Sequence, residues 1–82
     1  MNKNVKTFTK NKFQEIRVSI TEYQGNDLID IRTWTMPKGA EEMVPTGKGV
    51  SINVKLYPEL KEAVLALEGE LKAGNFLEGS KE

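Results

Sequence analysis

The sequence of 82 residues contains no cysteine and no histidine. Without cysteine no disulfide can stabilise the fold, and without histidine a structural metal would need carboxylate ligands alone. A chain of this length buries only about 60% of its unfolded surface, so it is marginally stable by itself. We therefore expect one domain without metal or cofactor, which gains stability by pairing with a second copy of itself.

Long apolar runs and a net charge are also absent. No run approaches the about 20 residues of a membrane span, and the lysine-rich N-terminus lacks the apolar segment of a signal peptide. We therefore expect a cytoplasmic protein without membrane contact. The zero net charge hides a split, because residues 1–55 hold nine Lys/Arg against six Asp/Glu and residues 56–82 hold three against six. This split indicates a basic face, although ordinary scatter of surface charge explains it equally well.

The missing side chains weigh against catalysis. Carboxylates such as Asp27 and Asp30 are the remaining acid–base candidates. Asp30 stands beside Arg32 on a predicted strand, where an ion pair is the ordinary outcome. Residues 46–49 contain Gly-Lys-Gly but lack the spacing and the following helix of a phosphate-binding loop. We expect a binding protein, not an enzyme.

Apolar residues alternate with polar ones in two segments, 13–23 and 27–36, and each is predicted to be a half-buried strand. Residues 50–54 alternate again, and a short strand near 42–44 is a further candidate. Residues 1–11 show no periodicity and are expected to form a flexible N-terminal arm. The domain is therefore predicted to span residues 12–76, followed by a frayed tail over 77–82.

A helix is predicted after the last strand. Pro58 suits its first turn, Asn53 could cap an earlier turn, and Gly74-Asn75 is the expected stop. One apolar stripe follows helical spacing: Leu60, Val64, Leu67 and Leu71. The fold class is therefore α+β, and the stripe packs either on its own sheet or on a second copy. A dimer is favoured because one helix cannot cover the sheet and also hide the remaining apolar residues.

The two predicted strands form a hairpin around Gly25-Asn26, interpreted as a type II′ turn. Paired residue numbers then sum to 51, which places Arg17 opposite Trp34 as a cation–π pair. The outer face of this hairpin carries four large side chains: Arg17, Tyr23, Arg32 and Trp34. Single-stranded nucleic acid needs cations for its phosphates and aromatic faces for its bases. Alternatively, Trp34 and Tyr23 belong to a second apolar face that a helix or a partner subunit covers.

Two lysines could extend this face. Lys48 stands between two glycines, so its ammonium and nearby backbone N–H groups can approach a phosphate. Lys12 and Lys10 add basic reach from the arm, although solubility alone explains each of them.

Two motifs resemble a known family. The run Leu-Ile-Asp-Ile-Arg at 28–32, and the run at 45–53 followed by Leu-Lys-Glu at 60–62, are similar to segments of the transcriptional coactivator positive cofactor four family. The resemblance covers about Phe13–Leu67 and is greatest to short bacterial members. It implies a curved antiparallel sheet of four strands followed by a C-terminal helix. It also implies a homodimer that holds single-stranded DNA with little sequence preference.

The resemblance also implies roles for single residues. Tyr23 takes the place of a base-stacking aromatic, and Arg32 and Lys48 match basic positions of the family. Trp34 falls one position before the family's tryptophan, where Thr35 stands, but alternation places Trp34 on the face of Arg32. Three basic family positions are replaced, which predicts weaker phosphate contact: Gln24, Asn26 and Gly47.

We therefore expect a homodimeric, largely sequence-independent single-stranded DNA-binding protein that acts in transcription or DNA maintenance. The expected nucleic-acid-binding residues are Lys12, Arg17, Tyr23, Arg32, Trp34 and Lys48. Two alternatives remain open from the sequence. One is an RNA-binding protein, and the other is a protein-interaction module that uses the same aromatic and basic face.

Overall fold

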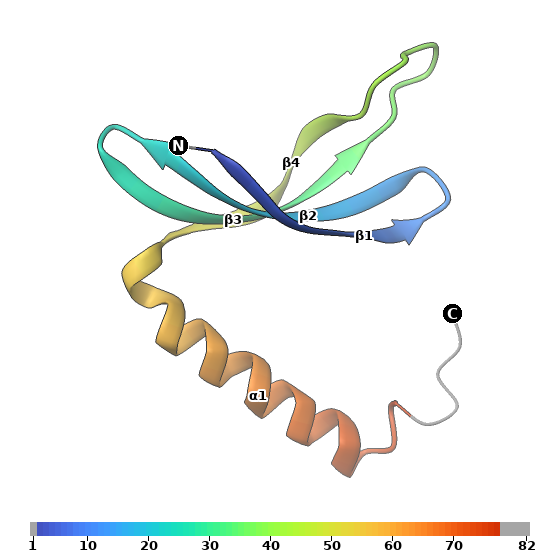
Figure 1. The fold of residues 1–82 in the computed structure, drawn as a ribbon. Helices are drawn as coiled ribbons and strands as arrows, with labels where there is room; N and C mark the ends of the chain where they lie inside the picture. The colour runs from blue at the N-terminus through green and yellow to red at the C-terminus, as the bar shows by residue number, and fades with distance from the viewer. Residues whose placement is uncertain (1, 78–82) are drawn as a thin grey trace.

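Four antiparallel strands and one helix make up residues 2–77, the part of the chain that the computed structural model describes (Figure 1). The elements are β1 (Lys3–Asn11), β2 (Gln14–Tyr23), β3 (Asn26–Thr35), β4 (Val44–Asn53), a 3-10 turn η1 (Val54–Leu56) and α1 (Tyr57–Ala73). The strands form one sheet in the order β1-β2-β3-β4, and the sheet twists and curves strongly. This confirms the expected four-stranded antiparallel sheet followed by a C-terminal helix.

The N-terminal segment is a correction to the sequence prediction. Residues 1–11 were expected to be a flexible arm, but β1 pairs with β2 along its length, so the sheet begins at Lys3. The alternation in β1 is hidden because Val5 is an extra residue in a bulge between the pairs Asn4–Ser19 and Lys6–Val18. The expected tail over 77–82 lies, beyond Leu77, outside the described residues.

The β2–β3 hairpin has the predicted faces but a different turn. Its central residues are Gln24 and Gly25, with φ of 52° and 82°, as a type I′ turn requires. Paired numbers therefore sum to 49, not 51, so that Arg17 lies opposite Arg32 and Trp34 opposite Glu15. The slip is two residues, and side chains alternate with a period of two, so every residue stays on its predicted face.

The last strand, Val44–Asn53, is continuous where two short segments were predicted, and it contains Val44 of the first and residues 50–53 of the second. It carries a bulge, because β3 advances two residues from Arg32 to Trp34 while β4 moves four, from Gly49 to Pro45. Residues 46–48 thus lie opposite Thr33 alone. Gly49 closes the bulge against β3, where an added Cβ would lie 2.6 Å from the Ile31 carbonyl oxygen.

Gly49→Ala is expected to lower the free energy of unfolding by about 1–3 kcal/mol, because overpacking pushes β4 away from β3. Gly47→Ala is the matched control, since nothing lies within 4 Å of a Cβ added there. That variant should equal the wild type or gain up to about 1 kcal/mol from a less flexible unfolded chain. Urea unfolding at one fixed protein concentration measures both, and equal stability of the two variants would contradict the close approach.

The helical segment begins and ends as the sequence predicts. Asn53 caps η1, with its side-chain oxygen accepting a hydrogen bond from the Lys55 N–H at 2.9 Å, and proline stands in the first turn of α1. After Ala73, the Asn75 N–H donates to the Lys72 carbonyl and the Phe76 N–H to the Leu71 carbonyl. With Asn75 at φ 61°, this is a Schellman end, which stops the helix at the expected place.

Most of α1 stands clear of the sheet (Figure 1). Only its first turn approaches, and there an apolar groove of about 340 Å³ opens between the sheet and the helical segment. Its main walls are Val18, Ile20, Ile29, Ile31, Val54, Tyr57 and Leu60. No large apolar side chain among the described residues is fully buried, and Val64 and Leu67 of the predicted stripe are each more than half exposed. The described chain therefore has apolar faces but no closed core.

The chain is correspondingly open. Its accessible surface is 6645 Å², whereas a compact monomer of 9.2 kDa has about 4,900 Å². Its radius of gyration is 15.1 Å, against about 12 Å for a compact chain of this length. No helix among residues 2–77 is long and apolar enough to span a bilayer.

Candidate nucleic-acid interface

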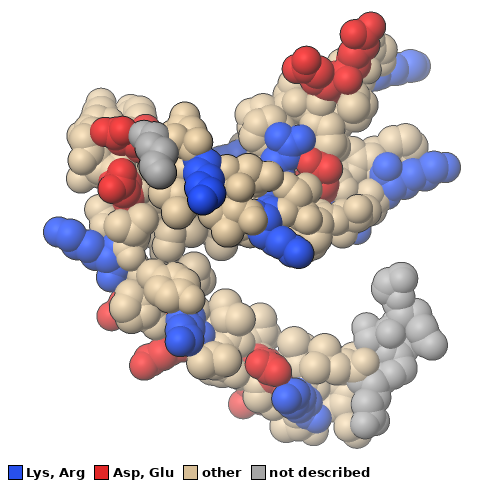
Figure 2. Space-filling model, in the orientation of Figure 1, with Lys and Arg blue, Asp and Glu red and all other residues tan. Residues whose placement is uncertain are grey.

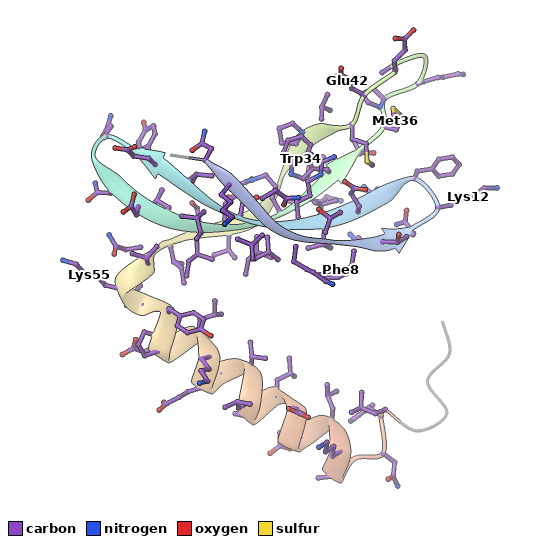
Figure 3. The ribbon with its side chains drawn as sticks, viewed as in Figure 1. Phe8, Lys12, Trp34, Met36, Glu42 and Lys55 are labelled. Atoms are coloured by element: carbon purple, nitrogen blue, oxygen red, sulfur yellow. The ribbon has the colours of Figure 1, made fainter. Side chains whose placement is uncertain are left out.

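The sheet face that points away from α1 carries three of the six predicted binding residues: Arg17, Arg32 and Trp34. We call it the Trp34 face, and it consists of Glu15, Arg17 and Ser19 of β2 with Asp30, Arg32 and Trp34 of β3. Figure 3 places Trp34 on this side and Phe8 on the side toward the helix. The helix therefore does not cover Trp34, which is half-buried by its neighbours in the sheet.

Arg17 and Trp34 form the predicted cation–π pair. The guanidinium carbon of Arg17 lies 4.0 Å from the centre of the indole ring. The contact is diagonal across the hairpin, because Arg17 is paired with Arg32 and Trp34 with Glu15. Glu15 also accepts a hydrogen bond from Nε of Arg17, so the guanidinium is held from both sides.

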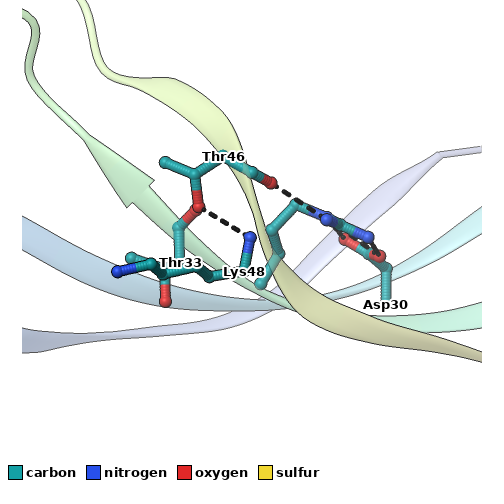
Figure 4. A network of polar contacts seen from close by, with 5 residues as sticks. Asp30, Thr33, Thr46 and Lys48 are labelled. Carbon is teal, nitrogen blue, oxygen red and sulfur yellow. Dashed lines mark hydrogen bonds and ion pairs between the residues drawn. The ribbon is translucent and has the colours of Figure 1, made fainter.

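Arg32 makes more hydrogen bonds within the protein than Arg17 does. Its Nε and Nη2 donate to the Asp30 carboxylate, with Nη2 at 2.8 Å, and its Nη1 donates to the backbone carbonyl of Thr46 at 2.9 Å (Figure 4). Hydrogen bonding to Asp30 raises the pKa of the Arg32 guanidinium above its usual value. The ion pair expected from the sequence is confirmed, but it is mostly shielded from solvent, with 24% of the Arg32 and 16% of the Asp30 side chain exposed.

Lys48 projects from the β4 bulge next to this pair and is exposed. Its backbone N–H donates to the hydroxyl of Thr46 at 3.1 Å, and that hydroxyl donates to the Thr33 carbonyl at 2.9 Å. Within residues 2–77, no carboxylate lies within ion-pair distance of the Lys48 ammonium. Lys48 is therefore a cation that the protein leaves open to a ligand.

Tyr23 and Lys12 lie away from this cluster. Tyr23 is 63% exposed at the far end of the β2–β3 hairpin, six residues or about 20 Å from Arg17. Lys12 occupies the β1–β2 turn, and its ammonium lies 5.8 Å from the centre of the Phe13 ring. The structure thus brings together Arg17, Arg32 and Trp34, links the backbone of Lys48 to Arg32 through Thr46, and leaves Tyr23 and Lys12 at opposite ends of the sheet.

Basic and acidic side chains are interspersed on the surface of the sheet, as the ion pairs of Arg17 and Arg32 suggest. Figure 2 shows basic and acidic side chains side by side on the sheet and acidic ones at the tip of the β3–β4 loop, where Glu41 and Glu42 stand. The two arginines of the Trp34 face are each paired with a carboxylate of their own strand. The centre of this face is therefore close to neutral.

Two residues of the site were missed by the sequence prediction. Thr46 fixes the bulge through both its carbonyl and its hydroxyl, and Glu15 orients Arg17. The place of Glu15 two residues before Arg17 on one strand was a usable signal, because such residues share a face. The role of Thr46 depends on the bulge and left no signal in the alternation pattern.

Known proteins share this arrangement of strands and helix. The profile of the family described as Transcriptional Coactivator p15 (PC4) matches residues 10–63, which include the β2–β3 hairpin, the bulge and the start of α1. The chain belongs to the PC4 family. The resemblance found in the two sequence motifs is thereby confirmed, and the profile begins within β1, the strand that the sequence prediction missed.

Solved structures of PC4 relatives show the same fold. A PC4 homologue from Burkholderia pseudomallei matches in its tetragonal crystal form with a TM-score of 0.74 and 26% identity, covering 83% of this chain and 98% of that one. Its orthorhombic form gives 0.71 and 28%, covering 82% and 89%. A bacteriophage T5 homologue of the eukaryotic coactivator PC4, implicated in recombination-dependent DNA replication, matches at 0.65 and 21%, covering 93% and 83%.

Proposed function

We propose that this PC4-family chain is a homodimeric, largely sequence-independent single-stranded DNA-binding protein that uses the Trp34 face. The observation that carries the proposal is the Arg17–Trp34 stack, on the sheet face that α1 leaves open. A guanidinium 4.0 Å from the ring centre fixes the indole plane. A base can then stack on Trp34 without reordering it, and stacking tolerates any base.

Single strands fit this face better than duplexes. Stacking on Trp34 requires an unpaired base with a free ring face, and a duplex hides its base faces within the helical stack. The binding function proposed here needs no enzymatic step and no cofactor.

Phosphate contact is assigned to the lysines. Arg17 and Arg32 are held by Glu15 and Asp30, so each would have to share its donors with a carboxylate. Lys48, beside the pair, and Lys12, at the β1–β2 turn, carry free charge along the sheet. Four lysines per dimer predict a moderate dependence of affinity on salt.

The homodimer is proposed because apolar surfaces of the sheet and of α1 are left exposed in a single chain. The groove between sheet and helix is lined mainly by isoleucine, valine and leucine, and Val64 and Leu67 of the stripe on α1 are each more than half exposed. The surface in excess of a compact monomer is about 1,700 Å² per chain, or about 3,400 Å² for two chains, which lies in the range of obligate homodimer interfaces. A second copy offers the same two surfaces and can cover both.

A titration of labelled oligo-dT at several salt concentrations tests the proposal. We expect binding that weakens with salt, with a log–log slope of about −3 for four lysine–phosphate contacts. Lys48→Gln should make the slope less steep by about 0.7 for each phosphate that it leaves without a cation. Lys55→Gln, which changes a lysine of η1 on the helix side, is the control and should leave the slope unchanged.

Three further measurements separate the alternatives. A duplex of equal length should bind more weakly, and equal or tighter duplex binding, or no binding at low salt, would contradict the proposal. Quenching of Trp34, the single tryptophan, reports whether the oligonucleotide reaches this face. Oligo-rU run alongside distinguishes an RNA preference from a DNA preference.

A further inference from the structure

We propose that Arg32 acts as a positioning residue: together with Asp30 and Thr46 it holds the β4 bulge that presents Lys48, and it does not itself bind a phosphate. This inference rests on the proposed function, since it names which cation of the Trp34 face meets the ligand. It reverses the role that family resemblance gives to Arg32, and it makes an uncharged residue, Thr46, part of the binding site.

Three of the five N–H donors of Arg32 are already in use. A guanidinium has five N–H donors in a fixed fork. Asp30 takes the Nε donor and one of the Nη2 donors, and the Thr46 carbonyl takes one from Nη1 (Figure 4). A phosphate gripped through the Nε–Nη2 edge, one of the two-donor edges of the fork, would therefore break the pair with Asp30, whose side chain is only 16% exposed. An uncompensated carboxylate at that depth opposes such an exchange.

The contacts of Arg32 lead directly into the bulge. The Thr46 carbonyl accepts a hydrogen bond from Arg32, and the Thr46 hydroxyl donates to the Thr33 carbonyl and accepts from the Lys48 N–H. A chain of hydrogen bonds thus runs from the Asp30 carboxylate through Arg32 to the Thr46 carbonyl, and from the Thr46 hydroxyl to the backbone N–H of Lys48.

The bulge needs this support because ladder hydrogen bonds do not supply it. Residues 46–48 face Thr33 alone, and the middle one is Gly47, the residue type with the widest backbone freedom. An unsupported bulge would sample many directions for Lys48, and ordering it on binding would cost affinity. With the contacts in place, the backbone of Lys48 is held in one position relative to Arg32.

A double-mutant cycle separates positioning from direct contact. Thr46→Val removes the hydroxyl without changing charge, and we expect it to weaken oligo-dT binding about threefold to tenfold, as for coupled neighbours. In a Lys48→Gln background the same change should have less than about a twofold effect, because the ammonium that Thr46 positions is already absent. Full additivity of Thr46→Val and Lys48→Gln would overturn the inference.

The slope of log affinity against log salt concentration provides a second test of the role of Arg32. Arg32→Gln and Lys48→Gln should each reduce the steepness of the slope, and the double variant should match Lys48→Gln alone. A further reduction of about 0.7 per protomer in the double variant would show that Arg32 binds a phosphate itself. If Arg32→Gln fails to fold because Asp30 is left unpaired, the variant carrying both Arg32→Gln and Asp30→Asn replaces it.

A measurement on the free protein separates the positioning role of Arg32 from the proposed DNA-binding function. Amide hydrogen exchange at Lys48 should accelerate by about tenfold or more in Thr46→Val and Arg32→Gln, because local opening of the bulge becomes easier. Arg17→Gln, which removes the arginine paired with Glu15 rather than the bulge contact, is the matched control and should leave this amide unchanged. Unchanged exchange in all three variants overturns the positioning role even if DNA binds. Accelerated exchange with no DNA binding supports the positioning role and rejects the proposed function.

Discussion

Trp34→Ala is expected to weaken binding of single-stranded DNA by about tenfold to a hundredfold, the effect of removing one aromatic platform on which a base stacks. The indole is the one large aromatic side chain held flat on this face by a cation, with Arg17 at 4.0 Å from its ring centre. Its removal also frees Arg17 to turn fully toward Glu15, which removes charge as well as stacking surface. Fluorescence anisotropy of labelled oligo-dT measures the affinity.

Two further variants make this result specific. Trp34→Phe keeps a ring and should recover much of the affinity, because stacking tolerates any flat aromatic surface of sufficient size. The exchange variant with Trp34→Thr and Thr35→Trp has the same composition but carries the tryptophan on the opposite face of β3. It should bind as weakly as Trp34→Ala. Wild-type affinity in the exchange variant would refute the assignment of the face, provided that its thermal unfolding remains cooperative.

The face assignment shows how much of this site the sequence can predict. Alternation placed Arg17, Arg32 and Trp34 together even though the turn was misplaced by one residue, because the resulting slip of two residues preserves the face. Gln24 takes a positive φ at a position where the prediction did not require one. Hydrophobic alternation therefore predicted correctly which residues share a face of the sheet. The turn residues alone did not predict correctly which residues pair across the hairpin.

Bulges explain what the sequence does not predict. Val5 sits outside the ladder of β1, so the strand lacks a period of two and its pattern indicates an arm instead. The β4 bulge likewise hides the meeting of Thr46 with Arg32, two residues 14 positions apart. A bulge is set by the partner strand as much as by its own residues, so single-strand patterns do not reveal it.

The helix shows the opposite case. Its bounds follow from local signals, a proline in the first turn and an αL residue, Asn75, at the end, and the sequence predicts both correctly. Its packing partner does not follow from them. The predicted stripe at Val64 and Leu67 meets nothing in the described chain, so the alternative in which the helix covers its own sheet is not supported beyond the first turn.

Leu67→Asp is accordingly expected to have the largest effect on stability of any single change in α1. In an isolated chain this side chain is 56% exposed, and a surface substitution there would change stability by no more than about 0.5–1 kcal/mol. In the proposed homodimer it is part of a shared core, where loss of a leucine costs about 2–5 kcal/mol per helix even before a charge is buried. The dimer dissociation constant should rise on the order of a thousandfold or more.

Ala66→Asp is the matched control, because it places the same charge one residue earlier and off the stripe, on an exposed part of the helix. Sedimentation equilibrium and thermal unfolding at two protein concentrations distinguish the two variants. The wild type and Ala66→Asp should sediment as dimers with a Tm that rises with concentration, whereas Leu67→Asp should sediment as a monomer that is largely unfolded. A folded wild-type monomer at micromolar concentration, or equal stability of the two variants, would show that α1 closes a core within one chain. The Trp34 faces would then act singly, and an oligonucleotide long enough to span two of them would gain no affinity over a short one.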